Sequence, residues 1–90
     1  MLYMVVETFR DGHAVPVYRR VRDIGRGIPA GLRYVSSWVT ADMKRCYQVM
    51  ETDRRELLDE WIRHWSDLVE FEMFEVITSA EARAAVDAGL

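Results

Sequence analysis

The sequence predicts a single α+β domain whose elements follow the order β-α-β-β-α-β, with a short helix at the C-terminus. Three observations support this fold class. Four segments are rich in the β-branched and aromatic residues typical of strands. Two further segments repeat apolar residues at the spacing of one helical face, and turn signals separate the elements. The chain has 90 residues, the size of one small domain.

The first half of the chain predicts one strand and one helix. Leu2–Phe9 is rich in strand-forming residues and ends at the turn signal Asp11-Gly12. A helix is expected from Pro16, because proline fits a first helical turn. It should stop around Gly25-Arg26-Gly27. Its apolar stripe consists of Val17, Val21, Ile24 and Ile28.

The second half predicts a hairpin and a second helix. Strands are expected over Leu32–Val39 and Arg45–Glu51, joined by a link short enough for a hairpin. Asp53 stands three residues before Glu56, the spacing of a capping box, and so predicts the start of a helix. The apolar positions of this helix are Leu57, Leu58, Trp61, Ile62, Trp65 and Leu68.

A fourth strand is expected over Val69–Ile77, followed by a second capping-box spacing at Thr78 and Glu81. An Ala-rich helix ending near Gly89 should follow. We therefore expect one domain over residues 1–78 and a helical tail over residues 79–90. Two right-handed crossovers would place the first and third strands at the centre of a four-stranded antiparallel sheet with both main helices on one face. This is the ferredoxin-like plait.

Both faces of the predicted sheet are apolar. In the first strand, Leu2, Met4 and Val6 alternate with Tyr3, Val5 and Phe9. Two helices cover only one face of the sheet. A face that stays exposed to water should consist mainly of polar residues. A second copy packed sheet against sheet would cover it, so we expect a homodimer in the form of a dimeric α/β barrel.

Composition excludes several function classes. Half of the residues are hydrophobic, although a compact monomer of this size still exposes roughly 5,400 Å². The net charge of −3 argues against nucleic acid as a partner, and no apolar run is long enough to span a membrane. The single cysteine, Cys46, and a start without signal-peptide features lead us to expect a cytoplasmic protein.

The span from Met1 to about Ala82 resembles a small bacterial family classed as a domain of unknown function, within the dimeric α/β-barrel superfamily. The resemblance rests on Met1–Glu7, Val15–Arg20, Tyr34–Val39, Arg45–Glu51, Leu57–Trp61 and Trp65–Leu68. It implies the fold and dimerisation but supplies no reaction motif. The superfamily includes cofactor-free oxygenases, isomerases, haem-degrading enzymes and stress-induced proteins. The haem-degrading branch uses an Asn on the first strand, and this chain contains no Asn.

Three residues are candidates for acid/base chemistry: Glu7, His64 and Tyr34. Glu7 is a carboxylate in a central strand, where it either pairs with an arginine such as Arg45, lies at a wet barrel mouth, or acts as a general base with a raised pKa. His64 lies at the boundary of its helix stripe, as a hydrogen-bonding surface residue or as an acid or base at a pocket edge.

Four further residues are candidates for ligand binding: Tyr18, Ser36, Trp38 and Trp61. Strand alternation places Tyr34, Ser36 and Trp38 on one face, a pattern typical of a small apolar pocket and equally of a dimer interface. Trp61 is also suited to the core, and Tyr18 could roof a pocket with its hydroxyl group.

No metal or cofactor is expected, because His13, His64 and Cys46 show no ligand spacing. Two functions remain open. The first is a dimer that binds a small apolar or aromatic molecule and carries out cofactor-independent acid/base or oxygenase-type chemistry. The second is a non-catalytic homodimer that serves as an interaction or stress-associated module.

Overall fold

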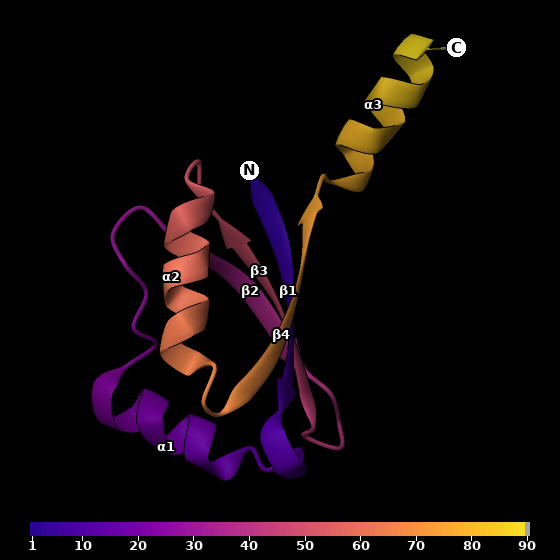
Figure 1. The fold of residues 1–90 in the computed structure, drawn as a ribbon. Coiled ribbons are helices and arrows are strands. Elements are labelled where there is room, and N and C mark those ends of the chain that lie inside the picture. Colours follow the sequence, from indigo (N-terminus) through magenta and orange to yellow (C-terminus); the bar gives the residue numbers. More distant parts are fainter. Residues whose placement is uncertain (90) are drawn as a thin grey trace.

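The computed structural model describes residues 1–89 and has the predicted α+β architecture (Figure 1). One antiparallel sheet carries α1 and α2 on the same side, and α3 follows the last strand. The elements are β1 (Leu2–Phe9), the 3-10 turn η1 (Arg10–Gly12), α1 (Val15–Ile24), β2 (Arg33–Val39), β3 (Arg45–Glu51), α2 (Arg55–Trp65), β4 (Val69–Val76) and α3 (Ser79–Gly89).

The strand order β2-β3-β1-β4 confirms the ferredoxin-like plait. β1 lies at the centre and pairs antiparallel with both β3 and β4. Its side chains alternate between fully covered and half-buried, with Tyr3, Val5, Glu7 and Phe9 on the covered face. The sheet therefore has one helix-covered face and one open face.

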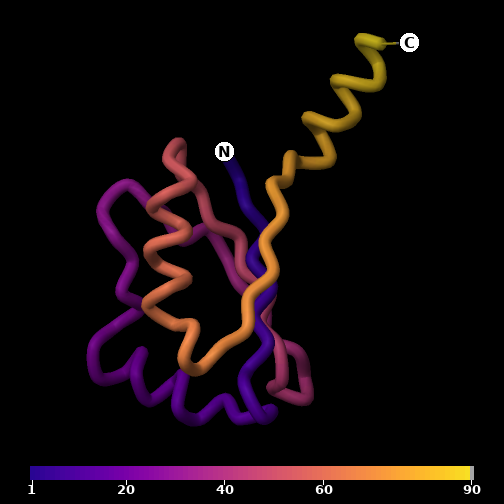
Figure 2. Tube along the Cα trace, viewed as in Figure 1, coloured from indigo at the N-terminus to yellow at the C-terminus, as the bar shows by residue number. Residues whose placement is uncertain are grey.

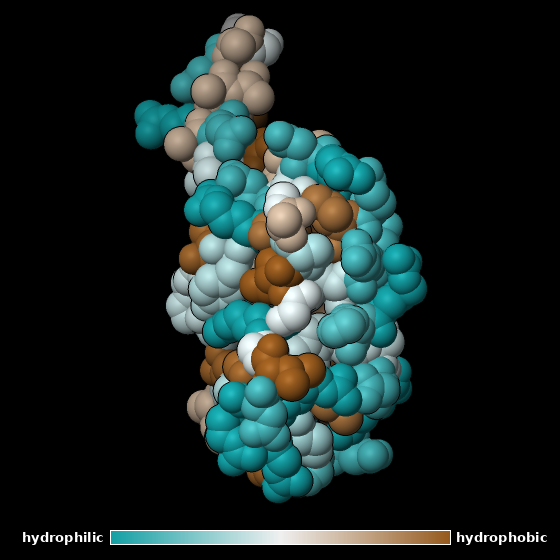
Figure 3. Space-filling view, turned by 90° about the vertical axis from the view of Figure 1, so that its left-hand side faces the viewer, coloured by the Kyte–Doolittle hydropathy of each residue, from teal (hydrophilic) through white to brown (hydrophobic). Residues whose placement is uncertain are grey.

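The core lies between the covered face and α2. Four residues of α2 are buried: Leu57, Leu58, Trp61 and Trp65. They pack with Tyr3, Val5 and Met50 from the central strands. Seen from the side of Figure 1 that carries α2, the surface is mostly hydrophilic with separate hydrophobic patches (Figure 3). The outer surface of this layer is therefore largely polar.

α1 covers one end of the sheet and buries none of its residues completely. The tube view shows it running across the lower end of α2 rather than alongside it (Figure 2). Val17 and Val21 of the predicted stripe pack against the core, whereas Ile24 is 66% exposed. The helix ends at Ile24 because Gly25 takes a φ of 76°, which confirms the predicted stop.

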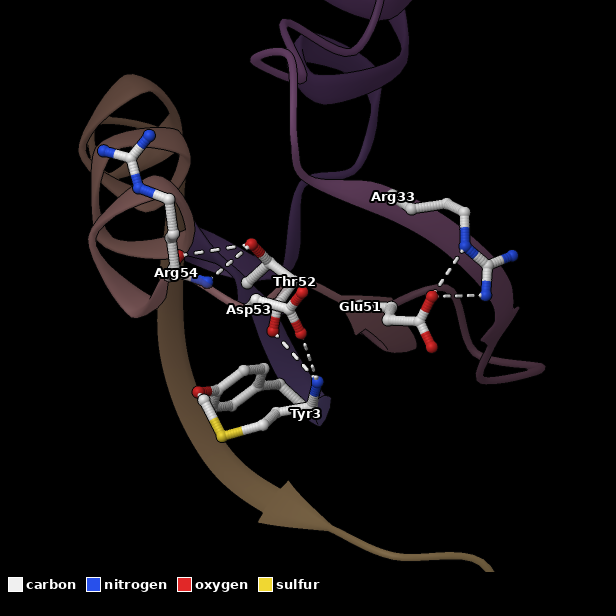
Figure 4. A network of polar contacts seen from close by, with 7 residues as sticks. Tyr3, Arg33, Glu51, Thr52, Asp53 and Arg54 are labelled. Carbon is white, nitrogen blue, oxygen red and sulfur yellow. Dashed lines mark hydrogen bonds and ion pairs between the residues drawn. The ribbon is translucent and has the colours of Figure 1, made fainter.

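The predicted capping box at Asp53 is wrong. Arg54 occupies the N-cap position with an extended backbone and without a side-chain cap. Asp53 instead lies 3.6 Å from the N-terminal ammonium group, which also donates a hydrogen bond to the Thr52 carbonyl oxygen at 3.1 Å (Figure 4). The turn is held by the Arg54 backbone N–H, which donates to Thr52 Oγ1 at 3.0 Å. The helix therefore starts one residue later than the Asp53 spacing predicts, after the turn that Thr52 holds.

The predicted arrangement of Tyr34, Ser36 and Trp38 on one face is also wrong. β2 shifts register between Tyr34 and Ser36, so Val35 is an extra residue, as in a β-bulge. Tyr34 pairs with Met50 on the covered face, and its hydroxyl group shares a 2.7 Å hydrogen bond with Ser37 Oγ. The bulge thus turns Ser36 and Trp38 to the open face.

The open face is apolar, as the alternation predicts. Leu2, Met4 and Val6 of β1 form its centre and are half-buried. Trp38 and Phe74 flank them and are 60% and 53% exposed. The chain exposes 6072 Å², more than expected for a compact monomer of its size.

α3 extends beyond the end of β4, away from α1 and α2, and contains no buried residue (Figure 1). Its start follows the predicted capping box. The Glu81 backbone N–H donates to Thr78 Oγ1 at 3.1 Å, and the Thr78 backbone N–H donates to the Glu81 carboxylate at 3.3 Å. α3 is thus a locally specified helix outside the core.

Removing residues 79–90 should leave the fold of residues 1–78 intact. Because α3 buries no side chain, we expect the thermal midpoint to change by no more than about 4 °C in calorimetry. Leu58→Ala, in the core, should instead lower the free energy of unfolding by about 2–5 kcal/mol. A truncated chain that no longer unfolds cooperatively would show that the tail belongs to the domain.

Candidate functional site

A cavity of about 80 Å³ lies between the covered face of the sheet, α1 and the turn that follows α1. Its volume is several times the ~10–15 Å³ that one water molecule requires. Most of its wall is apolar or aromatic. The lining residues are Glu7, Phe9, Val17, Tyr18, Val21, Arg26, Ser37, Val39, Cys46, Gln48, Trp61 and Trp65.

Glu7 is the buried acid of this cavity. β1 register places it on the covered face, opposite Cys46 on β3 and Phe71 on β4, and its residue exposure is 8%. Burial raises the pKa of its carboxyl group, while a hydrogen bond from the Cys46 thiol and the charge of Arg26 lower it. Burial is the largest of these effects.

Of the alternatives for Glu7, pairing with Arg45 is wrong. Arg45 stands opposite Thr8, which lies between Glu7 and Phe9 and therefore on the other face of β1. Neither strand neighbour of Glu7 is a cation. The positive charge acting on this carboxyl group comes from the turn that carries Arg26.

Arg26 is held at the edge of the cavity by its own backbone. The flanking Gly25 and Gly27 take positive φ values of 76° and 68°, which let the chain turn back over α2. The Arg26 carbonyl oxygen accepts hydrogen bonds from the Trp61 and Trp65 indole N–H groups at 3.0 and 2.9 Å. Two buried tryptophans therefore fix the backbone of the residue that carries the charge, and its side chain is exposed at the cavity edge.

The Arg26 guanidinium stacks on the ring of Tyr34, with 4.3 Å from its central carbon to the ring centroid. Its charge also acts on Tyr18 and Cys46 across the cavity. The sequence predicts Gly25-Arg26-Gly27 only as the end of the first helix and does not indicate this role of Arg26. Two glycines around one arginine favour a turn, but they do not show which groups the turn contacts.

The other polar groups of the cavity are neutral. Burial, followed by the nearby Glu7 charge, raises the pKa of the Cys46 thiol to about 12, so it is not a thiolate at neutral pH. Partial burial also raises the pKa of Tyr18, whose ring meets Phe9 edge-on at 6.4 Å between centroids. These groups can donate hydrogen bonds, and Glu7 is the group suited to accept a proton.

The structure brings three of the seven sequence candidates to the cavity wall: Glu7, Tyr18 and Trp61. Tyr34 lies just behind the wall, beneath Arg26 and bonded to Ser37. His64 is exposed on α2 outside the cavity, with its ring near Gly27. The remaining two, Ser36 and Trp38, belong to the open face.

Residues 1–89 contain no cluster of three or more His, Cys, Asp or Glu side chains that could hold a metal ion. Within the same residues, no helix has the length and apolar character needed to cross a bilayer.

Comparison with known proteins gives a family but no activity. No curated protein matches the chain. The chain is similar to the crystal structure of protein Atu4242 from Agrobacterium tumefaciens, with 14% sequence identity and a TM-score of 0.47, over 88% of this chain and 96% of that one. Residues 1–90 match the family model described as Domain of unknown function (DUF3303). This match over the whole length shows that the chain belongs to the DUF3303 family.

Proposed function

We propose that the protein binds a small, mostly apolar molecule in the cavity and that Glu7 exchanges a proton with it. The observation that carries this proposal is a desolvated carboxyl group in an aromatic-lined cavity, with a fixed arginine at its edge. Concave sites with apolar walls and a few convergent polar groups are the usual form of small-molecule sites.

The size and lining of the cavity limit the ligand. A volume of about 80 Å³ favours a single ring or a short branched chain over an extended cofactor. The indoles of Trp61 and Trp65 and the rings of Phe9 and Tyr18 offer flat contacts, which suit an aromatic body. No step of the proposed reaction requires a bound cofactor.

The chemistry begins with proton transfer. The Glu7 carboxylate takes a proton from an activated C–H or O–H bond of the ligand, and the electron pair of that bond stays on the ligand as an anion. Burial strengthens Glu7 as a base, and the nearby Arg26 charge stabilises the anion that forms. Acid/base chemistry ends with the return of the proton, whereas oxygenase-type chemistry would add dioxygen to the same anion.

Glu7→Gln should stabilise the fold increasingly as pH rises. Burial disfavours the charged form, so the wild-type protein is most stable with Glu7 protonated. It loses that stability as pH rises from the ordinary value of 4.5 through the folded-state pKa. In urea unfolding between pH 4 and 8, the free energy of unfolding of the variant should exceed that of wild type by on the order of 1–3 kcal/mol at the upper end of this range.

Glu60→Gln, exposed on α2, controls for loss of charge. A difference that stays flat across this range would contradict the desolvation of Glu7.

Filling the cavity should abolish ligand binding. Phenol and 1,4-benzoquinone serve as single-ring probes, and amide shifts in NMR titrations report where they bind. Val39→Phe puts a ring into the cavity and should weaken binding at least about tenfold, a loss on the order of 1.4 kcal/mol. Val35→Phe is the matched control, because Val35 lies on the same strand outside the cavity with 40% exposure against 38% for Val39. Equal binding by both variants would exclude the cavity as the site.

We also propose that two copies associate through their open faces. The centre of this face is apolar, and its two sides differ in charge. Glu70 and Glu72 lie on the edge strand β4, Arg45 lies on β3 on the other side of β1, and Arg33 on β2 is already paired with Glu51. A two-fold axis parallel to the strands would set the β4 carboxylates of one protomer over the side of its partner that carries Arg45.

Phe74→Glu should dissociate this dimer. Phe74 is 53% exposed on the open face, so a charge there disturbs the contact and not the core. In sedimentation velocity at micromolar concentration, wild type should have twice the monomer mass and the variant the monomer mass. Ile24→Glu, at a 66% exposed position on α1, should remain a dimer. A monomeric wild-type protein would refute association through the sheet.

A further inference from the structure

We infer that the ligand of the cavity carries a carboxylate and that Arg26 is the residue that binds it. This inference rests on the proposed function, since it specifies the chemical class of the molecule in the same cavity. It follows from three features of the described residues: an arginine that acts on Glu7 at a distance but forms no ion pair, a backbone that holds it in place, and an amide in the same cavity with a weak acceptor.

The Arg26 guanidinium has N–H groups to offer. Within residues 1–89, it forms no ion pair and donates no hydrogen bond to another group. Arg20 and Arg33, by comparison, are paired with Asp67 and Glu51 at 2.6 and 2.7 Å. Arg26 instead lies over the Tyr34 ring, with its central guanidinium carbon 4.3 Å from the ring centroid. This cation–π contact uses none of the guanidinium N–H groups in a hydrogen bond to an oxygen, so they are left for a ligand.

The position of Arg26 is set before any ligand arrives. The two indole N–H groups hold its carbonyl oxygen, and the side chains of both tryptophans are themselves buried in α2. The Tyr34 ring beneath the guanidinium is fixed in turn by the hydrogen bond to Ser37. An anion that binds this guanidinium therefore has less side-chain freedom to remove than at an ordinary surface arginine.

Gln48 is a second polar group prepared for a ligand. It is 3% exposed and lines the same cavity. Its side-chain N–H donates to the Met50 sulfur at 3.0 Å. Thioether sulfur is a weak acceptor, so an oxygen atom of a ligand would be a better partner for this amide. The cavity thus has unused donor capacity at two points, one charged and one neutral.

These features favour a carboxylate over a larger anion. The planar guanidinium edge matches the two oxygens of a carboxylate. A phosphate group would bring up to two negative charges beside Glu7 with a single cation to balance them. A carboxylate at Arg26 leaves the aromatic walls for the rest of the molecule and directs its body toward Glu7. The ligand class is therefore a small aromatic or branched carboxylic acid.

Benzoate and benzamide test this inference as a matched pair, because they have nearly the same shape and differ in charge. Their dissociation constants are measured by NMR titration at pH 7 with four proteins. For wild type, benzoate should bind at least about tenfold more tightly than benzamide. In Arg26→Gln, the preference should fall to twofold or less, and Arg26→Lys should retain part of it. Arg63→Gln, which removes an exposed arginine of α2 outside the cavity, should leave it unchanged.

A second readout separates anchoring from a structural role. An anion bound beside Glu7 makes its carboxylate harder to form, so benzoate should raise the pKa of Glu7 more than benzamide does, because benzamide excludes water but brings no charge. Carboxyl ¹³C shifts measure this pKa. The groups that face Glu7 are Tyr18, Arg26 and Cys46, and only Arg26 among them is charged at neutral pH. If Arg26→Gln weakens both probes equally, Arg26 only supports the cavity wall and the inference fails.

The outcomes also separate this inference from the proposed function. Equal binding of benzoate and benzamide in the cavity of the wild-type protein would overturn the carboxylate assignment while the small-molecule site stands. Binding of neither probe, together with no binding of phenol or benzoquinone, would overturn both. A benzoate preference that Arg26→Gln removes and Arg63→Gln keeps supports both.

Discussion

The hydrogen bonds from two indole N–H groups to one carbonyl oxygen are the interaction on which this structure depends. Trp61 and Trp65 stand four residues apart on α2, so both rings reach the same side of the helix and meet the Arg26 carbonyl. A buried indole without an acceptor costs about 1–3 kcal/mol, and here one oxygen serves both. The same contact fastens the loop between α1 and β2 to α2, and thereby closes the cavity on that side. Core packing and the position of the functional charge thus have a single cause.

The carboxyl group of Glu7 is the counterpart of this contact. Strand alternation forces its side chain into the covered layer, because Val5 and Phe9, its neighbours two residues away, must also face inward. The layer tolerates the acid through a thiol hydrogen bond and the charge of the Arg26 guanidinium, and the balance still raises the pKa of Glu7. An apolar residue at this position would pack without that penalty. A desolvated acid beside a cavity is the arrangement expected of a functional group rather than of a stabilising one.

The sequence was sufficient for the strands, their order and α2, because these depend on periodic patterns and on the handedness of crossovers. It was insufficient wherever one residue changed the local geometry. The extra residue Val35 places Tyr34 and Trp38 on opposite faces, and alternation carries no sign of a bulge. Asp53 had the right spacing for a cap, but Thr52 accepts the Arg54 backbone N–H at 3.0 Å and Arg54 takes the N-cap position instead. The site was predictable for Glu7 and not for Arg26, whose position depends on tertiary hydrogen bonds.

The central strand separates the two proposed functions of the molecule. Adjacent residues Val6 and Glu7 point to opposite faces, so the cavity and the proposed dimer surface share strands, β1 among them, but no side chain. None of the residues that line the cavity lies on the open face. A second copy packed on the open face would therefore act on the cavity through the shared strands, such as β1, whose backbone carries Glu7 on one side and the apolar centre of the open face on the other. Binding and association are thus physically separable properties of one sheet.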